Sequence, residues 1–296
     1  MHGRMYNEAI LEVALRPRTP LLIKSGEATG LDPSLPDMPF VRMRRPVAEG
    51  ATEEVIYIPG SSFRGVLRSH AERLVRSVNP NAACSVTGEN CLQRQGLREA
   101  DLCGEEAYAR SCYTCRLFGN TGIASRVKVS DFYPCGQLLT EVRPGVAIDR
   151  VTGAVAHGPF QMETVTDGEF SGTITVRNFT LGQLGLLAAA LLDISDGLVP
   201  LGHAKSRGLG RVTFTRWKLT FRFLRDPEGK VKGLGALVDA ETREKFDLPE
   251  ASADSVELDI QPRRERGFYV SVIEGDEAKT WLDEKVVPFW VEQLGS

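Results

Sequence analysis

Six cysteines offer the most distinctive chemistry in this chain, and all of them lie between residues 84 and 135. Cys112 and Cys115 form a C-x2-C pair, a spacing that lets two thiolates contact one tetrahedral ion. Cys84 and Cys91 lie upstream and could supply the two remaining ligands. Because a set of thiolates around one ion is typical of closed structural zinc sites, the sequence predicts bound Zn²⁺ here.

Free thiols or a redox pair are the alternatives to zinc for this cluster. Disulfides are disfavoured, because the N-terminal residues show no apolar secretory signal and we expect a cytoplasmic protein. Cys103 competes for one ligand position, whereas Cys135 follows an expected strand and is expected to be packed. The segment around 88–104 is polar and contains glycines, so a metal cross-link would order it.

A first segment with anion-binding potential is I-P-G-S-S-F-R-G-V-L-R, residues 58–68. Ser61 or Ser62 is expected to cap a helix, and backbone amides at a helix N-terminus bind anions. Arg64 and Arg68 lie one turn apart and could face the same phosphate chain. Taken alone, the pattern favours an ordinary helix cap with two solvated arginines, and it is not a Walker A loop.

A second such segment is G-H-A-K-S-R-G-L-G-R, residues 202–211. Its glycines allow the backbone to approach a polyanion, and Lys205, Ser206 and Arg207 supply hydrogen-bond donors. A strand is expected to follow, so the segment is not a dinucleotide-binding loop. A flexible basic hairpin is the alternative, but two basic loops beside one sheet favour RNA more than either does alone.

The composition is that of a globular protein, with 42% hydrophobic and 25% charged residues among 296. Disorder, collagen and coiled coil are thereby excluded. The longest apolar stretch, Leu184 to Leu192, is much shorter than the roughly 20 residues of a membrane-spanning helix. The sequence therefore predicts a soluble protein.

The net charge of −3 argues against a freely diffusing nucleic-acid binder, but the charge is unevenly distributed. Residues 226–296 carry 17 acidic against 9 basic side chains, and residues 1–225 carry 22 against 27, of which 23 are arginine. The arginine fork suits phosphate, so residues 1–225 could present a phosphate-binding surface. An arginine-rich source composition is the alternative.

The hydrophobic periodicity predicts a β-α-β-β-α-β order, which indicates an α+β, ferredoxin-like or RNA-recognition-motif fold with large insertions. A long irregular stretch over 17–59 separates the first strand from the first helix. Within that helix, His70 lies on the apolar face and is expected to be a satisfied core histidine. The expected strands are 8–15, 124–133, 169–176 and 211–223, with a hairpin over 142–165 and helices after 61 and over 181–194, the latter capped by Thr180.

Five motifs occur in a fixed order along the chain: I-P-G-S-S-F-R-G-V-L-R at 58–68, C-R-L-F-G at 115–119, A-S-R-V-K-V-S-D at 124–131, G-V-A-I-D-R at 145–150 and G-H-A-K-S-R-G-L-G-R at 202–211. Together they resemble the RAMP superfamily, and specifically the Csm/Cmr-type backbone subunits of type III CRISPR effector complexes. The resemblance covers about residues 8–225.

The resemblance implies a modified RNA-recognition-motif core over 1–225, with a β-hairpin thumb at about 142–168. The predicted zinc-bound insertion spans about 80–120 of this domain, and the acidic extension 226–296 has no counterpart that assigns it a role. The implied partners are CRISPR RNA, target RNA, neighbouring RAMP subunits and other type III effector subunits. The residues that we expect to contact RNA are Ser61, Ser62, Arg64, Arg68, Arg143, Arg150, Phe160, Lys205, Ser206 and Arg207.

The resemblance also implies a catalytic aspartate upstream of residue 58, and Asp37 matches its position, with Asp32 as the nearby rival. One carboxylate together with RNA phosphates could hold a catalytic Mg²⁺ or Mn²⁺, and the RNA 2′-hydroxyl would be the nucleophile. Without the resemblance, a turn-capping role for Asp37 is preferred. Phe160 and Met162 could wedge against a base near the thumb.

Three functions therefore compete: an RNA-guided endoribonuclease subunit, a purely structural RNA-binding subunit with an idle aspartate, and a zinc-stapled enzyme acting on small phosphorylated substrates. His157 and His203 lie in candidate RNA loops and could contact phosphate. Co-purified RNA of uniform length would exclude the third function.

Overall fold

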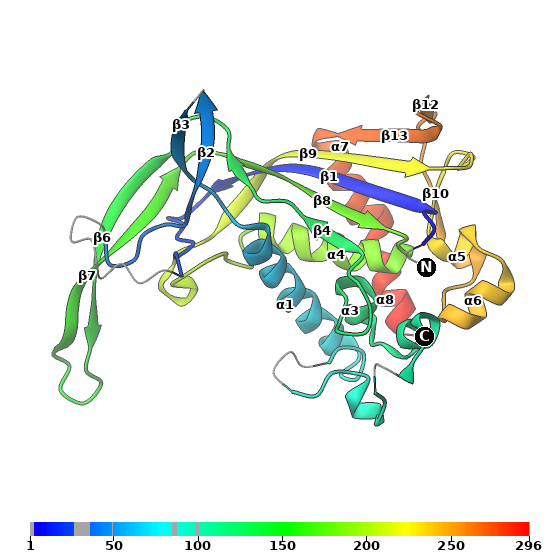
Figure 1. The fold of residues 1–296 in the computed structure, drawn as a ribbon, viewed down its shortest axis with the longest axis horizontal. Helices are drawn as coiled ribbons and strands as arrows, with labels where there is room; N and C mark the ends of the chain where they lie inside the picture. Colours follow the sequence, from blue (N-terminus) through cyan, green and yellow to red (C-terminus); the bar gives the residue numbers. More distant parts are fainter. Residues whose placement is uncertain (1–2, 27–35, 49, 85–87, 99–100, 296) are drawn as a thin grey trace.

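The architecture is a layer of helices packed on one face of an antiparallel sheet (Figure 1). The structure, a computed structural model, describes residues 3–26, 36–48, 50–84, 88–98 and 101–295. The main sheet has the strand order β12-β13-β9-β1-β8-β4, and β5 also pairs with β8. Its strands are β1 (Asn7–Pro17), β4 (Val127–Val129), β5 (Tyr133–Pro134), β8 (Phe170–Arg177), β9 (Val212–Phe223), β12 (Arg263–Glu265) and β13 (Phe268–Glu274).

The remaining strands form three separate two-stranded sheets, and the described chain has eight α-helices. The two-stranded sheets are β2 (Arg42–Ala48) with β3 (Ala51–Ile56), β6 (Leu139–Ile148) with β7 (Val155–Asp167), and β10 (Lys230–Lys232) with β11 (Ser255–Glu257). The helices are α1 (Gly60–Val78), α2 (Gly104–Arg110), α3 (Tyr113–Phe118), α4 (Leu181–Ser195), α5 (Leu234–Leu237), α6 (Ala240–Phe246), α7 (Gly275–Trp281) and α8 (Pro288–Gly295). None of them, in the part of the chain that the structure describes, has the length and apolarity needed to cross a membrane.

The core forms between the sheet and the helices α1 and α4. In β1 the side chains of Leu11, Val13 and Leu15 are almost fully buried. Helix α4 is apolar around nearly its whole circumference because α1, α8 and β9 all pack against it. Thr180 caps it as the sequence predicts: the Gln183 backbone N–H donates to its hydroxyl at 3.3 Å.

The start of α1 differs from the expected serine cap. The helix begins at Gly60, and the Asp131 carboxylate accepts the Gly60 N–H at 2.7 Å, whereas Ser61 and Ser62 are exposed and do not cap it. A Cβ at position 60 would lie 2.5 Å from the Val129 carbonyl oxygen, so only glycine allows this approach. The cap is tertiary, which is why local sequence did not reveal it.

Two further expectations for secondary structure need correction. The strand expected over 124–133 is broken into β4 and β5, which pair with different parts of β8. The stretch 17–59 is not irregular throughout, because it contains the β2–β3 hairpin. That hairpin is joined by cross-strand ion pairs, Arg44 with Glu54 and Arg45 with Glu53, rather than by an alternating apolar face, so hydrophobic periodicity missed it.

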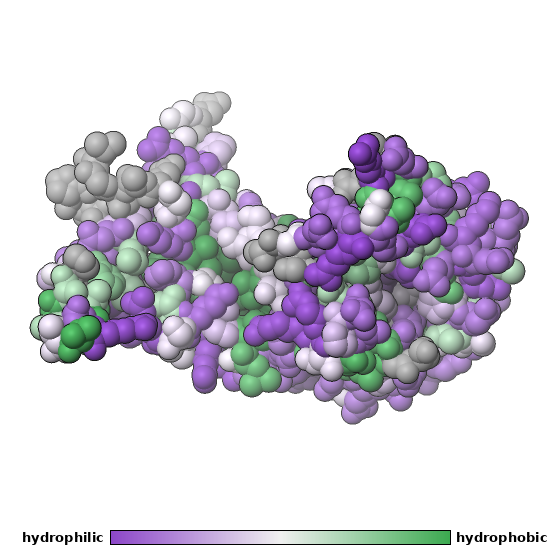
Figure 2. Space-filling view, turned by 90° about the horizontal axis from the view of Figure 1, so that it is seen from below, coloured by the Kyte–Doolittle hydropathy of each residue, from purple (hydrophilic) through white to green (hydrophobic). Residues whose placement is uncertain are grey.

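The hairpin expected over 142–165 is present as β6 and β7, which project from the body (Figure 1). We call this hairpin the thumb. Its base is fixed to the N-terminal segment, because Leu21 and Val165 exchange backbone hydrogen bonds at 2.8 Å in both directions. Several large apolar side chains of the thumb are exposed, with Val151 at its tip 93% accessible. Apolar residues also gather in the hollow between the thumb and the body (Figure 2).

The acidic extension after residue 225 completes the sheet and the core rather than forming a separate body. Strand β13 pairs with β9, and α8 packs on α4. One buried link is the carboxylate of Asp254, which accepts the Leu181 N–H of α4 at 2.6 Å and the Gly235 N–H at 2.7 Å. The domain boundary expected at 225 therefore falls within one continuous structure.

The burial of Asp254 predicts a characteristic pH dependence of stability. Burial raises the pKa of this carboxyl group from 3.8 to about 6, although its two backbone hydrogen bonds act in the opposite direction. Because the folded pKa exceeds the unfolded value, the stabilisation from its protonated form is complete below pH 4 and is lost as the pH rises to 6. We expect the free energy of unfolding of the wild type, minus that of Asp254→Asn, to fall by on the order of 3 kcal/mol between about pH 3 and about pH 7.

Urea unfolding at a series of pH values measures this difference, with Asp259→Asn, an exposed residue of the same segment, as the control. A difference that instead rises with pH would contradict the assignment, because that is the behaviour of a carboxylate stabilised by charge partners.

Candidate nucleic-acid interface and metal centre

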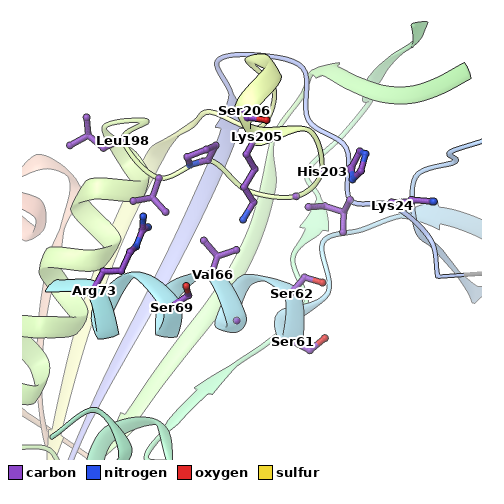
Figure 3. A pocket seen from close by; sticks show the side chains of 15 residues that line it. Lys24, Ser61, Ser62, Val66, Ser69, Arg73, Leu198, His203, Lys205 and Ser206 are labelled. Atoms are coloured by element: carbon purple, nitrogen blue, oxygen red, sulfur yellow. The ribbon is translucent and has the colours of Figure 1, made fainter. Parts of the chain in front are cut away.

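A large cavity lies between α1 and the loop that joins α4 to β9, with a volume of about 880 Å³ (Figure 3). We call it the groove. The groove brings together the two basic motifs of the sequence: Ser61 and Ser62 come from α1, and Lys205 and Ser206 from the loop. The other lining residues are Ile23, Lys24, Gly65, Val66, Ser69, Arg73, Leu198, Val199, Pro200, Gly202 and His203.

Backbone contacts fix the loop above α1. The His203 N–H donates to the Leu22 carbonyl oxygen at 2.7 Å, and the Gly210 N–H donates to that of Pro20 at 2.9 Å. Gly202 has φ +75°, and a Cβ there would lie 2.2 Å from the Leu22 oxygen. The glycines of this motif therefore let the loop lie directly on the 20–22 segment, which sets the position of Lys205.

The groove is electrostatically suited to an anion. Lys24, Arg73 and Lys205 line it, and none of its described lining residues is acidic. Partial burial, followed by the charge of Arg73, lowers the pKa of Lys205. His203 has a buried ring Nε2 with no hydrogen-bond partner among the described residues. A phosphate would offset the mutual repulsion of the cations and offer acceptors to these donors.

Arg64 and Arg68 differ from the expectation that they face a common phosphate chain with the serines. Arg64 donates to the Phe118 carbonyl oxygen and to the Ser125 hydroxyl, and burial lowers its pKa. Arg68 donates to the Glu72 carboxylate at 2.9 Å and to the Gly119 carbonyl oxygen at 3.0 Å. Both side chains therefore bind the C-terminal end of α3 or the segment after it, and neither lines the groove.

Arg207 is exposed on the loop beside the groove and does not line it, and the expected thumb residues lie elsewhere. Arg143 is on β6, 3.4 Å from Glu141, and Arg150 is exposed at the tip of the thumb. Phe160 packs its ring against Gly145 and is half-buried. The structure thus describes two separate regions, the groove and the thumb, rather than one continuous set of predicted RNA contacts.

Met162, one of the two expected wedge residues, differs from the sequence expectation. Met162 is only 7% exposed and packs in the core at the base of the thumb, so it is not placed to wedge against a base. The side chain of His157 lies outside the described residues. His70 is the satisfied histidine that the sequence predicts, because its ring Nε2 hydrogen-bonds Asp193.

Asp37 is exposed at the base of the thumb, where its Oδ2 accepts the Gln161 N–H at 2.7 Å. Glu163, which is 8% exposed, holds the residues that follow Asp37. Its carboxylate accepts the Phe40 N–H at 2.9 Å and forms an ion pair with Arg42. Phe40 in turn bridges to Lys24 of the groove. The Asp37 segment is therefore tied to both the thumb and the groove, whereas Asp32 lies outside the described residues.

The four predicted ligands form one cluster. The sulfurs of Cys84, Cys91, Cys112 and Cys115 all lie within 4.8 Å of one another, and those of Cys84 and Cys115 are 3.4 Å apart. Ligands 2.3 Å from a tetrahedral ion would be about 3.8 Å apart, so this donor set fits Zn²⁺. Burial, followed by the charge of Cys112, raises the pKa of the Cys84 thiol. A bound metal ion would favour the thiolate instead, because it displaces the thiol proton.

Neighbouring donors support the cluster. The Arg68 guanidinium lies 3.6 Å from the Cys115 sulfur, and the Asn120 amide lies 3.7 Å from the Cys91 sulfur. Such N–H donors stabilise metal-bound thiolates from outside the ligand set. Cys103 is exposed at the start of α2 and does not belong to the cluster. Cys135 does not belong to it either, and the expectation that it is packed is wrong, because it is exposed after β5.

A model of the RAMP superfamily matches residues 15–213, which is more than half of the chain. The chain therefore belongs to the RAMP superfamily, a family that indicates CRISPR-associated RNA binding and association with CRISPR RNA and partner Cas subunits. A search of curated proteins finds no match.

Sequence reasoning missed three polar residues of the groove: Lys24, Ser69 and Arg73. Ser69 lies seven residues after Ser62, and Arg73 lies four residues after Ser69. Helical periodicity could therefore have placed all three on one face of α1. Lys24 had no such signal, because it lies in a stretch whose pairing depends on distant residues.

The cluster predicts that the folded chain binds about one Zn²⁺. Cys112→Ser or Cys115→Ser should abolish zinc binding and lower the unfolding temperature by several degrees, because the two sulfurs hold α3 against the segment that contains Cys84. Elemental analysis and thermal unfolding measure both effects.

Cys103→Ser and Cys135→Ser are the matched controls and should keep the metal. A folded wild-type protein that contains no zinc, and whose six cysteines all react rapidly with a thiol reagent, would refute the site.

Proposed function

We propose that this RAMP protein is a backbone subunit of a type III CRISPR effector complex and that its groove holds the sugar–phosphate backbone of the CRISPR RNA. The observation that carries the proposal is the meeting of two distant motifs across one cavity, Ser61 and Ser62 from α1 and Lys205 and Ser206 from the loop. The two motifs are separated by more than 130 residues, yet together they make a basic surface with hydroxyl donors.

The core topology supports a modified RNA-recognition-motif, or ferredoxin-like, fold. The path β9-β1-β8-β4 is antiparallel throughout, with α1 between β1 and β4 in sequence and α4 between β8 and β9. Strands, helices and order agree with a β-α-β-β-α-β unit. The zinc-bound insertion and the thumb then fall in the connections between its elements.

The composition of the groove suits a guide of any sequence. None of its described lining residues is Phe, Tyr or Trp, so bases have no aromatic platform there. Its hydroxyls and cations instead match phosphate oxygens, which carry no sequence information. A strand held by its backbone keeps its base edges available for pairing with target RNA.

We also propose that the subunit cuts the paired target RNA, with Asp37 as the catalytic residue. Its carboxylate could join target phosphates in holding Mg²⁺ or Mn²⁺, which would stabilise charge on the phosphate during attack by the 2′-hydroxyl. The exposure of Asp37 beside the projecting thumb supports access by a strand outside the groove. Neighbouring RAMP subunits and other effector subunits would complete the path of the RNA.

A purely structural RNA-binding subunit is the second candidate, and one observation favours it. The Asp37 carboxylate accepts the Gln161 N–H, a contact that fixes the loop to the thumb and needs no catalytic role.

The groove predicts that Lys205→Ala combined with Lys24→Ala, which removes two cations of its lining, weakens binding of single-stranded RNA. It also predicts that the slope of log affinity against log salt falls by about 0.7 for each lost phosphate contact. Fluorescence anisotropy at several salt concentrations measures both quantities. Lys285→Ala, which removes an exposed cation from the extension, is the control, and an unchanged slope in the double variant would refute this placement.

The catalytic proposal predicts that Asp37→Asn and Asp37→Ala both stop cleavage of a guide-complementary RNA in the assembled complex while guide binding persists. The asparagine oxygen can still accept the Gln161 N–H, so this variant removes the charge without releasing the loop. The wild-type complex should need a divalent ion and should fail on a target with a 2′-deoxy sugar at the cut position.

Normal cleavage by Asp37→Asn with loss only in Asp37→Ala would assign a structural role to the side chain. A wild-type complex that binds complementary RNA and never cuts it would establish the structural subunit.

A further inference from the structure

We infer that Arg73 and Lys205 form a distinct phosphate-binding subsite at one end of the groove, and that Asp193, acting through His70, positions Arg73 for it. The inference deepens the proposed function and rests on it, because it takes the ligand of the groove to be an RNA backbone. Arg73 belongs to α1 and Lys205 to the loop above it, and Figure 3 shows the two side chains extending into the cavity from these opposite walls.

Arg73 differs from the other arginines of its helix. Arg68 and Arg76 both donate to the Glu72 carboxylate, so their charges are paired within the protein, and Arg64 donates to the Phe118 carbonyl oxygen, which holds it away from the groove. The guanidinium of Arg73 donates to the neutral ring nitrogen Nδ1 of His70 at 3.1 Å, and no carboxylate of the described chain lies within ion-pairing distance of it. Its positive charge is therefore left for a ligand.

Lys205 is the second cation of the subsite. Partial burial and the nearby charge of Arg73 both lower its pKa, so the two groups repel each other without a shared counterion. Ser69 lines the same end of the cavity and adds a hydroxyl donor. Two cations and a hydroxyl, with no carboxylate among the described lining residues, are a binding site for a phosphodiester rather than for a metal or a neutral ligand.

The subsite lies far enough from Ser62 to contact a different phosphate. Ser62 and Arg73 are 11 residues apart on α1, which corresponds to about 16 Å along the helix axis. That distance is several times the axial spacing of phosphates along a nucleic-acid strand, roughly 3.4 Å in a duplex. In Figure 3, Lys24, His203 and Ser62 lie at one end of the cavity and Arg73 and Leu198 lie at the other. A strand that follows the groove would therefore contact both ends.

The hydrogen bonds to His70 fix the direction of Arg73. A guanidinium can only donate, so His70 Nδ1 must accept, which places the ring proton on Nε2. That proton is donated to the Asp193 carboxylate at 2.5 Å, and the His70 side chain is only 12% exposed. Asp193 on α4 thereby holds the ring of His70 on α1, and the ring holds Arg73, as an orienting carboxylate does for histidines in other sites.

The hydrogen bond between Asp193 and His70 also joins α4 to α1. The test must therefore separate the positioning of Arg73 by this bond from its contribution to the packing of the two helices. The probe is a fluorescein-labelled single-stranded RNA, bound by the full chain at a series of salt concentrations. Arg73→Ala should reduce the salt slope by about 0.7, the value for one phosphate contact with a single strand. Arg263→Ala, an exposed arginine of β12, is the control of equal charge and should leave the slope unchanged.

Asp193→Ala should weaken RNA binding by about threefold to tenfold in the wild-type background. It should have no effect on RNA binding in the Arg73→Ala background, because its action passes through that side chain. Asp193→Asn should restore most of the affinity, since the amide oxygen can still accept the His70 proton. Thermal unfolding of the same proteins measures any change in stability. A purely structural role of Asp193 would change the unfolding temperature without making the loss of RNA affinity depend on Arg73.

The outcomes distinguish this inference from the proposed function. A wild-type chain that binds no RNA, or whose salt slope is indifferent to Lys205→Ala, refutes the groove and the subsite together. Wild-type binding that depends on Lys205, with an unchanged slope in Arg73→Ala, overturns the subsite alone. An equal loss from Asp193→Ala in both backgrounds overturns the positioning role and leaves Asp193 as a tie between the helices.

Discussion

The seating of the α1 N-terminus against the end of β4 is the contact on which the functional regions depend. The Asp131 carboxylate accepts the Gly60 N–H, and the absence of a side chain at Gly60 lets the helix approach the backbone of Val129 and Ser130. This contact fixes both the position of the helix and its rotation about its own axis. Each face of the helix is therefore held against a particular part of the protein. Any larger residue at 60 would move the core, the metal cluster and the groove at once.

The three faces of α1 divide these tasks. Phe63 and Leu67 are buried in the core under the sheet. Arg64 and Arg68 face the segment after α3, and Arg68 also approaches the cysteine cluster. The face with Ser62, Ser69 and Arg73 is left to line the groove. Zinc bound by the cysteines would therefore stabilise the same helix that lines the groove, although the two sites share no residue.

The sequence predicted the order of the main elements because their signals are local. The alternation in β1 and β9 and the Thr180 cap of α4 all follow from neighbouring residues, and the structure confirms them. The cysteine cluster was also predictable, since thiolates at such spacings have few other uses.

The features that were missed depend on distant partners. The cap of α1 comes from Asp131, 71 residues away, and the place of residues 226–296 in the sheet depends on pairing between β13 and β9. The direction of Arg64 and Arg68 could not be read from helical spacing alone, because spacing gives a face but not what covers it. The resemblance supplied Asp37, whose position beside the thumb no local pattern indicates.

The open face of the sheet is the competing place for RNA, because it is the binding surface of RNA-recognition motifs. In β1 and β8, positions such as Glu12, Thr173 and Thr175 alternate with the buried residues and offer no aromatic ring for stacking. The most direct test of the account is to crosslink the RNA that co-purifies with the full chain and to identify the crosslinked peptides by mass spectrometry. The account predicts crosslinks within 61–73 and 198–206, and crosslinks confined to β1 and β8 would contradict it.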